Sequence, residues 1–217
     1  ENVSFQIAPK KLDGFLQGTI DEMDTNGQSF HSRDVLGFNV TIPHKVPVFI
    51  ESITTQTNPQ FLIVGSVNTI KREAGILKYF NTDVTGFIKS LQEDLEFNTS
   101  NKSVFIFGCG GAGRAVIAGL TQKGMGVKKI YLYDINKEAV ESAKKHFSDY
   151  KDCIENMNIL EFISFDQIAD RIKKSDLLVN ASPVGMKEGD GSIVDINLLH
   201  EKLWIYDVVY NRQTQLF

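Results

Sequence analysis

The sequence predicts an α/β protein built in two parts, and three observations support this prediction. Short apolar runs alternate with segments of helical periodicity, the order expected of a parallel sheet covered by helices. A glycine-rich turn, 108–113, follows one apolar run and opens a helical segment. A polar stretch, 96–102, separates two hydrophobic halves and has the composition of a linker. We therefore expect one α/β domain over 1–96 and a doubly wound domain over 101–217.

The first half has mixed periodicity. Alternation of apolar and polar residues predicts strands, and an apolar repeat of three to four residues predicts helices. On these patterns we expect strands at 3–7 and 37–42, two strands with a turn near 73–75 within 61–80, and helices at 9–23, 43–51 and 83–95. This half is therefore predicted to be a mixed α/β unit.

The second half alternates more regularly between short apolar runs and helical segments. We expect strands at 103–107, 129–133, 160–163, 177–179 and 203–208, and helices at 112–123, 137–147 and 166–173. Strand, helix and strand in repeated order predict a parallel sheet with helices on both faces.

Composition narrows the range of functions. The 217 residues are 42% hydrophobic and carry a net charge of −4, so neither nucleic acid nor an anionic membrane is an expected partner. No apolar run is long enough to cross a bilayer. Cys109 and Cys153 are expected to be free thiols, which suits a cytoplasmic location. The histidines lack metal-ligand spacing, so we expect no metal.

The turn 108–113 has the spacing G-x-G-x-x-G, and each glycine has a physical task. Gly108 permits a tight turn, Gly110 leaves room for a pyrophosphate to approach the backbone, and Gly113 lets the helix pack closely on the strand. Asp134 ends the next strand, where such sites carry an acid. The alternative is an ordinary turn with Asp134 as a helix cap. The strand–turn–helix–strand context favours a dinucleotide site.

The acid at position 134 also predicts the kind of dinucleotide. A carboxylate accepts hydrogen bonds from both ribose hydroxyls and repels a 2′-phosphate, so Asp134 favours NAD over NADP. Arg114 and Lys137 are nearby cations that could still meet a phosphate, so NADP stays possible.

Three polar clusters in the first half, 37–45, 65–69 and 81–83, are unusual for packing segments. Taken singly, each has an ordinary explanation. Lys45 could be a solvated surface charge, and Asp83 stands where a helix N-cap would. Asn68 could close a turn.

Together, six stretches resemble motifs of the shikimate/quinate dehydrogenase family. They match N-V-T-x-P-x-K at 39–45, V-N-T at 67–69, N-T-D at 81–83, G-x-G-G-A-x-[KR]-A at 108–115, N-[AT]-[ST]-P-x-G-M at 180–186 and the D-x-x-Y segment at 207–211. The resemblance covers nearly the whole chain. It implies a substrate-binding α/β domain followed by a Rossmann domain for a nicotinamide dinucleotide, with the active site between them.

The resemblance implies an oxidoreductase that interconverts shikimate and 3-dehydroshikimate, or also quinate and 3-dehydroquinate, in aromatic amino acid biosynthesis. The substrate class is a small hydroxylated cyclohexene or cyclohexane carboxylate. Lys45 and Asp83 match the family's catalytic pair. The substrate-binding residues that the resemblance implies are Thr41, Asn68, Asp83 and Tyr210. The cofactor-binding residues that it implies are Gly108, Gly110, Gly111, Ala112, Gly113, Asp134, Ser182 and Met186.

The sequence departs from the family pattern in three places. Family members usually begin with one more β-α unit, whose S-x-S or S-x-T pair holds the substrate carboxylate, and they end with one more helix. Both are missing from the sequence, so we expect the domain 1–96 to be truncated at its N-terminus and the chain as written to bind substrate weakly. NADP-binding members carry N-R-T where this chain has Tyr133, Asp134 and Ile135. That loss of arginine favours NAD and, by analogy, a quinate-using or dual-substrate member.

Two alternatives remain open on the sequence alone. Another two-domain dehydrogenase, such as methylene-tetrahydrofolate dehydrogenase, would share the architecture, but the segments 39–45 and 81–83 argue against it. A non-catalytic NAD-binding regulatory paralogue would keep the fold, but intact Lys45, Asp83 and Asn68 argue against that. The expected oligomeric state is a monomer or homodimer.

Overall fold

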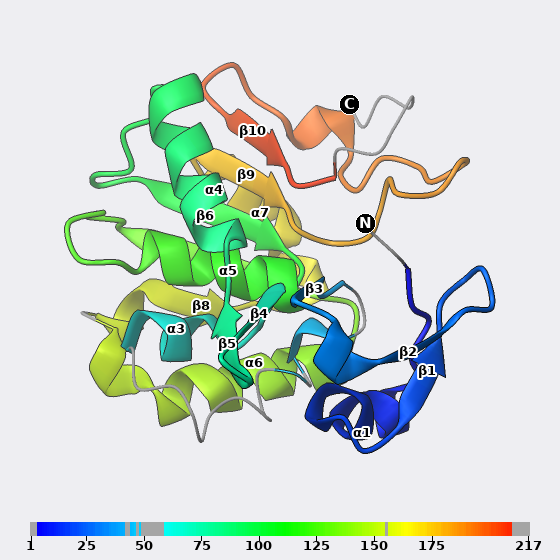
Figure 1. Ribbon diagram of the computed structural model, residues 1–217. Helices are drawn as coiled ribbons and strands as arrows, with labels where there is room; N and C mark the ends of the chain where they lie inside the picture. The colour runs from blue at the N-terminus through cyan, green and yellow to red at the C-terminus, as the bar shows by residue number, and fades with distance from the viewer. Residues whose placement is uncertain (1–3, 42–43, 47, 49–58, 155, 210–217) are drawn as a thin grey trace. The chain divides into compact units, whose positions relative to one another are not determined.

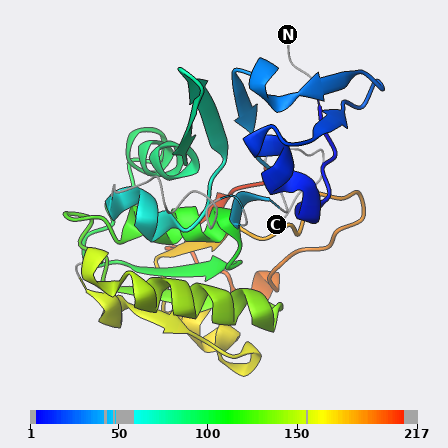
Figure 2. The same cartoon turned by 60° about the horizontal axis from the view of Figure 1, so that its bottom comes forward.

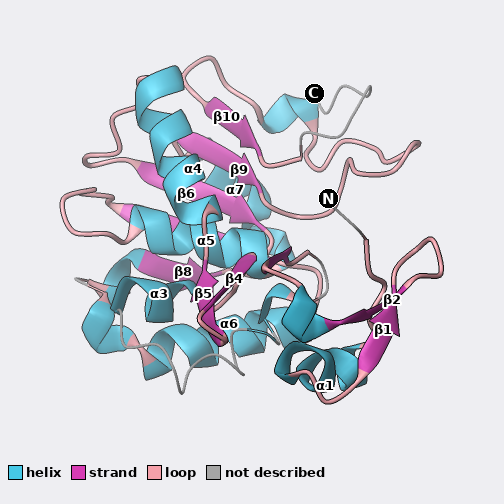
Figure 3. Cartoon of the chain, viewed as in Figure 1, coloured by secondary structure: helices cyan, strands magenta, loops and turns pink. Residues whose placement is uncertain are grey.

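The computed structural model describes residues 4–41, 44–46, 48, 59–154 and 156–209. Their helices and strands are distinguished by colour in Figure 3. The chain divides into two compact units, Glu1–Thr82 and Asp83–Phe217.

The division falls at the start of helix α4 (Asp83–Lys89) and not at the polar stretch 96–102, where we expected it. The reason is that α4 packs on a helix of the second unit. A Cβ added to Gly119 of that helix would lie 3.0 Å from Ile88, so the two helices approach closely there. The ring of Phe87 also lies 5.0 Å from that of Tyr206. The expected boundary at 96 is therefore later than the boundary between the compact units.

The first unit is built from short elements. Among its described residues, the helices with defined bounds are η1 (Pro9–Lys11), α1 (Leu12–Gln17), η2 (Ser32–Asp34) and α3 (Pro59–Val64), and residues 45, 46 and 48 are also helical. Its strands are β1 (Asp21–Met23), β2 (Ser29–His31), β3 (Gly37–Asn39), β4 (Thr69–Glu73) and β5 (Ile76–Phe80). β1 and β2 form an antiparallel pair, and β3, β4 and β5 form an antiparallel sheet in that order. Phe15 is fully buried at the centre, with the ring of Phe38 at 5.7 Å.

Several expectations for this unit were wrong in detail. The helix expected over 9–23 ends at Gln17, because Gly18 adopts the left-handed conformation (φ 70°) that terminates a helix. Within the described part of 3–7, only an isolated bridge at Phe5 is strand-like. The segment 61–64 is helical and not a strand. The helix expected over 43–51 lies largely outside the described residues.

The second unit holds a five-stranded parallel sheet in the spatial order β10-β9-β6-β7-β8 (Figure 1). Its strands are β6 (Ser103–Phe107), β7 (Lys129–Tyr133), β8 (Leu160–Phe162), β9 (Leu177–Asn180) and β10 (Trp204–Asp207). Its principal helices are α4, which continues as a π-helical turn over Ser90–Asp94, α5 (Gly111–Leu120), α6 (Lys137–Asp149) and α7 (Ile168–Lys173). The predicted doubly wound architecture is confirmed.

The helices cover both faces of this sheet. The chain runs from β6 through α5 to β7 and through α6 to β8, and right-handed crossovers in one direction place α5 and α6 on one face. It then returns through α7 to β9, on the other side of β6, so α7 lies on the opposite face. Figure 1 shows α4 and α5 in front of the sheet and α7 behind it, and Figure 2 shows α6 lengthwise. All five residues of β6 are buried, so this strand is the centre of the core.

The direction of winding reverses between β6 and β9, and ligands of such sheets bind at the carboxyl ends of the strands on either side of that point. The strand register aligns these ends. Phe107 pairs with Tyr133 on one side and with Asn180 on the other, and Asn180 pairs with Asp207. Four strands therefore end in one row.

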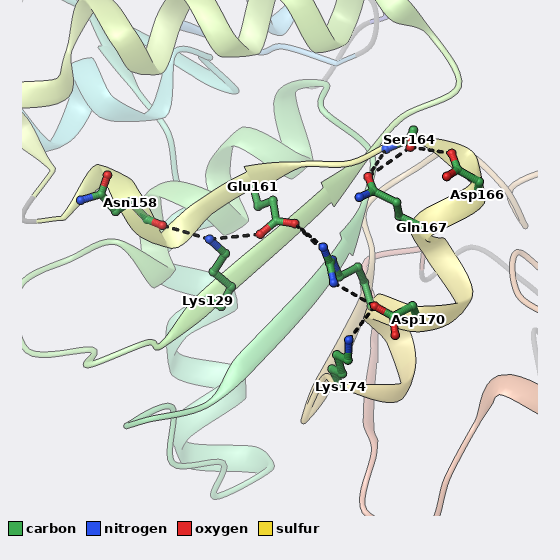
Figure 4. A network of polar contacts seen from close by, with 9 residues as sticks. Lys129, Asn158, Glu161, Ser164, Asp166, Gln167, Asp170 and Lys174 are labelled. Carbon is green, nitrogen blue, oxygen red and sulfur yellow. Dashed lines mark hydrogen bonds and ion pairs between the residues drawn. The ribbon is translucent and has the colours of Figure 1, made fainter.

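A network of charged side chains joins β7, β8 and α7 at the outer edge of the sheet (Figure 4). Glu161 forms ion pairs with Lys129 (3.1 Å) and Arg171 (2.9 Å). Asp170 forms ion pairs with Arg171 (2.8 Å) and Lys174 (2.7 Å). Partial burial alone would raise the pKa of Glu161, but the two cations outweigh it and hold the pKa below its ordinary value. Charges on an edge strand also discourage pairing with another chain.

Across the described segments, no helix combines the length and the apolar character that crossing a bilayer requires. Both cysteines are free thiols, as expected.

Candidate functional site

In the first unit, backbone hydrogen bonds bring together the segments that carry three predicted site residues. The N–H of Val40 donates to the carbonyl of Asn68 at 2.7 Å, one residue before Thr41. The N–H of Val67 donates to the carbonyl of Lys45, also at 2.7 Å. Thr41, Lys45 and Asn68 therefore come from two adjoining segments. Thr41 is exposed and Lys45 is half-buried.

The side chain of Asn68 is buried and holds the beginning of the third polar segment. Its Oδ1 accepts the N–H of Thr82 at 3.0 Å, and its Nδ2 donates to Thr82 Oγ1 at 2.9 Å. Thr69 Oγ1 also donates to Asn68 Oδ1. Asn68 thus fixes Thr82, the residue directly before Asp83, and these bonds join segments 14 residues apart in the chain.

Two substrate-side predictions remain, Asp83 and Tyr210. Asp83 is the first residue of α4 and is half-buried, in the second unit, whereas Lys45 belongs to the first. Tyr210 lies outside the described residues. Ser66 joins the polar cluster 65–69 to the cluster 81–83, because its carbonyl and its Oγ both accept from Asn81 Nδ2 at 3.0 Å.

In the second unit, the glycine turn has the geometry that its spacing predicts. Gly108 has φ 105°, and a Cβ there would lie 2.6 Å from the carbonyl oxygen of Ala181. A Cβ on Gly113 would lie 2.0 Å from the carbonyl oxygen of Gly108. Gly110, by contrast, is exposed and has no atom within 4 Å of such a Cβ. Gly113 therefore lets the turn close on itself, and Gly108 lets it lie against the chain at Ala181. Gly110 leaves an open face at the N-terminus of α5.

Gly111 and Ala112 are the first two residues of α5, where the N–H groups of a helix lack intrahelical acceptors. The first helical hydrogen bond runs from the N–H of Arg114 to the carbonyl of Gly110 at 2.9 Å. The open face of the turn and the positive end of the helix dipole therefore coincide, an arrangement suited to phosphate groups.

The carboxylate of Asp134 is hydrogen-bonded to the glycine turn 108–113. Its Oδ2 accepts the N–H of Cys109 at 2.8 Å, and its Oδ1 accepts the N–H of Asn136 at 2.8 Å. Because Cys109 lies inside the turn, Asp134 anchors it to the end of β7. The sequence predicted the position of this acid but not its backbone partners.

Arg114 and Cys109 are buried beside this anchor. Arg114 is 3% exposed and donates from Nη2 to Ser142 Oγ at 2.8 Å. Burial lowers the pKa of its guanidinium. Burial also raises the pKa of the Cys109 thiol to about 12, and the charge of Asp134 adds to that rise. Of the two cations that could still meet a 2′-phosphate, Arg114 is thus packed inside the unit, whereas Lys137 is exposed.

A second turn follows β9 and carries Ser182 and Met186. The N–H and Oγ of Ser182 both donate to Asn180 Oδ1, at 3.1 and 2.7 Å. Asn180 Nδ2 donates to Asp207 Oδ1 at 3.0 Å. Met186 is 48% exposed, so its side chain is available for contact. Sequence reasoning matched Asn180 and Asp207 to motifs but named neither as a site residue, although both end strands of the sheet.

In the described parts of the chain, no group of three or more His, Cys, Asp or Glu side chains is arranged to hold a metal ion.

The parallel sheet, the closed glycine turn and the acid after the second strand define a dinucleotide-binding α/β protein. Comparisons with individual known proteins agree with this class, although no protein-family model matches the chain. It is 35% identical over 210 residues to a shikimate dehydrogenase (NADP(+)) from Geobacter metallireducens, a match that covers 96% of this chain and 67% of the relative. The chain belongs to the shikimate dehydrogenase family.

Solved structures support this assignment. The shikimate dehydrogenase of Aquifex aeolicus superposes with a TM-score of 0.69 at 28% identity, over 97% of this chain and 67% of that one. The quinate dehydrogenase of Corynebacterium glutamicum, solved in complex with NAD, gives a TM-score of 0.69 at 27% identity, again over 97% and 67%. The chain thus spans about two thirds of the length of each protein.

Proposed function

We propose that this protein is an oxidoreductase that interconverts shikimate and 3-dehydroshikimate with a nicotinamide dinucleotide, as a step of aromatic amino acid biosynthesis. Membership of the shikimate dehydrogenase family carries the proposal. Quinate and 3-dehydroquinate are proposed as a second substrate pair, because a quinate dehydrogenase is among the similar structures.

The residues of the second unit fit a dinucleotide. Gly110 leaves an open face at the N-terminus of α5, where a side chain would obstruct a pyrophosphate. Gly111, Ala112 and the turn 108–113 would hold the phosphates through backbone N–H groups. Ser182 and Met186 would flank the nicotinamide end. When bound, the cofactor supplies the hydride acceptor for the alcohol and the hydride donor for the ketone.

The chain's own residues would bind the sugar-like substrate and move its proton. Oxidation of the ring alcohol releases a hydroxyl proton, which we assign to Nζ of Lys45 as general base. Asp83 would orient the substrate by accepting a hydrogen bond from a second ring hydroxyl, because the single proton of the reacting hydroxyl goes to Lys45. Thr41, Asn68 and Tyr210 would hold the other hydroxyls. A site that hydrogen-bonds several hydroxyls rejects analogues that lack them, since its polar groups would stay unpaired.

We propose NAD as the preferred form of the cofactor. Each oxygen of Asp134 accepts one backbone N–H, and a carboxylate has about four acceptor positions, so capacity remains for ribose hydroxyls. The same charge disfavours a 2′-phosphate, and the nearby guanidinium of Arg114 is buried against Ser142. The Geobacter relative is named for NADP(+), so NADP is the form to test against NAD.

The deciding measurement is cofactor reduction by the full-length protein, with shikimate and quinate each paired with NAD and NADP. Turnover of either acid supports the proposal, and the ratio of kcat/KM for NAD to that for NADP tests the cofactor preference. Binding of NAD without turnover of any pair would instead identify a non-catalytic NAD-binding protein.

Two substitutions test the assigned roles. Lys45→Ala should lower kcat at least a hundredfold, the low end of a general acid–base contribution, while the cofactor Kd stays within twofold. Asp134→Ala should weaken NAD and improve NADP relative to it. Unchanged turnover removes Lys45 from the mechanism, and an unchanged NAD-to-NADP ratio removes Asp134 from cofactor choice.

A further inference from the structure

We infer that Asn180 and Asp207 form a positioning pair that fixes the turn 181–186, and with it Met186, at the carboxyl edge of the second unit's sheet. The inference rests on the proposed function, because it takes this turn to be the nicotinamide side of the cofactor site. Both residues act through the turn and need not touch the cofactor.

The amide of Asn180 is fully engaged. The side chain is 1% exposed at the end of β9. Its Oδ1 accepts from Ser182 N at 3.1 Å and from Ser182 Oγ at 2.7 Å. Its Nδ2 donates to the carbonyl of Val184 at 3.1 Å and to Asp207 Oδ1 at 3.0 Å. An amide offers two acceptor positions and two donor hydrogens, so the turn and Asp207 use its whole capacity.

Asp207 extends the same arrangement to the neighbouring strand. It pairs with Asn180 in the register of β9 and β10, and its Oδ1 also accepts the N–H of Val209 at 2.9 Å. The N–H of Val208 donates to the backbone carbonyl of Asn180 at 2.9 Å. The turn after β9 and the segment after β10 are thus tied to one buried amide.

The far end of the turn is closed separately. Asp190 Oδ2 accepts the N–H groups of Gly185 (2.8 Å) and Lys187 (3.0 Å), which flank Met186. The N–H of Met186 donates to the carbonyl of Pro183 at 3.1 Å, while its side chain is half exposed. The backbone of Met186 is therefore fixed from both sides, and its side chain is presented outward.

A purely structural role for Asn180 makes a different prediction from a positioning role. General loosening of the unit would weaken every part of a bound dinucleotide. Loss of the turn alone would weaken only the nicotinamide end, because the adenosine end is assigned to Asp134 and the glycine turn. NAD and ADP-ribose, which lacks the nicotinamide, separate the two cases.

The experiment is calorimetric titration of the full-length protein with NAD and with ADP-ribose. Asn180→Ala should raise the Kd for NAD at least tenfold and leave the Kd for ADP-ribose within twofold. Ser175→Ala is the matched control, since it removes a buried hydrogen bond (to the carbonyl of Arg171, 2.8 Å) before the other end of the same strand. It should change neither Kd by more than twofold. Equal losses for both ligands, or no loss for either, would overturn the inference.

A charge exchange tests the pair without deleting a side chain. Asn180→Asp places a second carboxylate at the position that now donates to Asp207, and it should weaken NAD. Adding Asp207→Asn to this variant again places one amide donor and one carboxylate acceptor between positions 180 and 207. The double variant should recover part of the lost NAD affinity but not all of it, because the Val184 carbonyl still faces a carboxylate oxygen. A double variant that binds NAD no better than Asn180→Asp would refute the pairing. If the unsubstituted protein binds neither NAD nor NADP, the proposed function itself fails and the inference with it. If it binds only NADP, the titrations use NADP and 2′-phospho-ADP-ribose.

Discussion

Gly113 and Gly110 lie in one turn but have opposite surroundings, so alanine at each position should fail in a different way. A Cβ on Gly113 would lie 2.0 Å from the oxygen and 2.8 Å from the carbon of the Gly108 carbonyl, whereas real Cβ contacts essentially never fall below 3.0 Å. The turn would have to open by about 1 Å, and both obstructing atoms are backbone.

The magnitude follows from these distances. Overpacking costs about 1–3 kcal/mol, and an obstruction made of backbone places Gly113→Ala near about 3 kcal/mol. Alanine recovers about 1 kcal/mol of helix propensity relative to glycine, so the net loss should be about 2 kcal/mol. Gly110 has φ −75° and open space around it, so Gly110→Ala should change stability by less than about 0.5 kcal/mol. Its methyl group would instead occupy the open face, and the cofactor Kd should rise at least tenfold.

Urea unfolding and cofactor titration measure the two effects side by side. Gly124→Ala is the control, because Gly124 has φ 90° and no neighbour within 4 Å, so that it reports backbone strain alone, of order 1 kcal/mol. Equal destabilisation by Gly110→Ala and Gly113→Ala would refute the steric argument. Normal cofactor binding by Gly110→Ala would show that the open face is not where the pyrophosphate lies.

Three further predictions concern the second unit. A thiol reagent should modify Cys153 and spare Cys109 in the native protein, because Cys109 is 1% exposed and burial raises its pKa to about 12; rapid reaction of both thiols before unfolding would contradict this. Burial alone would raise the pKa of Asp176, but a backbone N–H and Lys102 outweigh it and lower the pKa. Asp176 thus stabilises the fold above about pH 4, and this contribution is lost as pH falls through the lowered folded pKa. Asp176→Asn should therefore be less stable than wild type in urea at pH 7 by about 0.5–1 kcal/mol, and an equal gap at pH 3 would argue against it. Asn136→Ala should cost about 1 kcal/mol in the same assay, because Asn136 caps α6, whereas Asn136→Asp should keep the cap; equal stability of the two variants would exclude capping.

The second unit was largely predictable because its strands are short apolar runs between turn residues. β6 and β7 have the bounds that the sequence predicts, and α6 begins at Lys137 as expected. The first unit was harder. Gly18 ends a helix that apolar spacing alone would continue, and a short apolar run such as 61–64 fits a helix or a strand equally well by periodicity.

The candidate site was also predictable only in part. Spacing located the glycine turn and Asp134, because the motif is local in sequence. Spacing could not indicate that Asp134 bonds the N–H of Cys109, or that Asn180 bonds Asp207, since those contacts depend on which strand ends lie side by side. Long-range polar partners of this kind are visible only once the order of the strands is known.

The alignment of four strand ends in one row has a consequence for how this protein can change in length. The residues Tyr133, Phe107, Asn180 and Asp207 stand at one level of the sheet, and the turns that follow the first three carry the residues that we propose for cofactor binding. Connections at the opposite edge, such as 121–128, enter the strands from their amino ends. Insertions or deletions there leave the row intact, whereas one residue added within a strand would shift its whole turn and reverse its side chains. Length variation among relatives should therefore collect at the amino edge of this sheet.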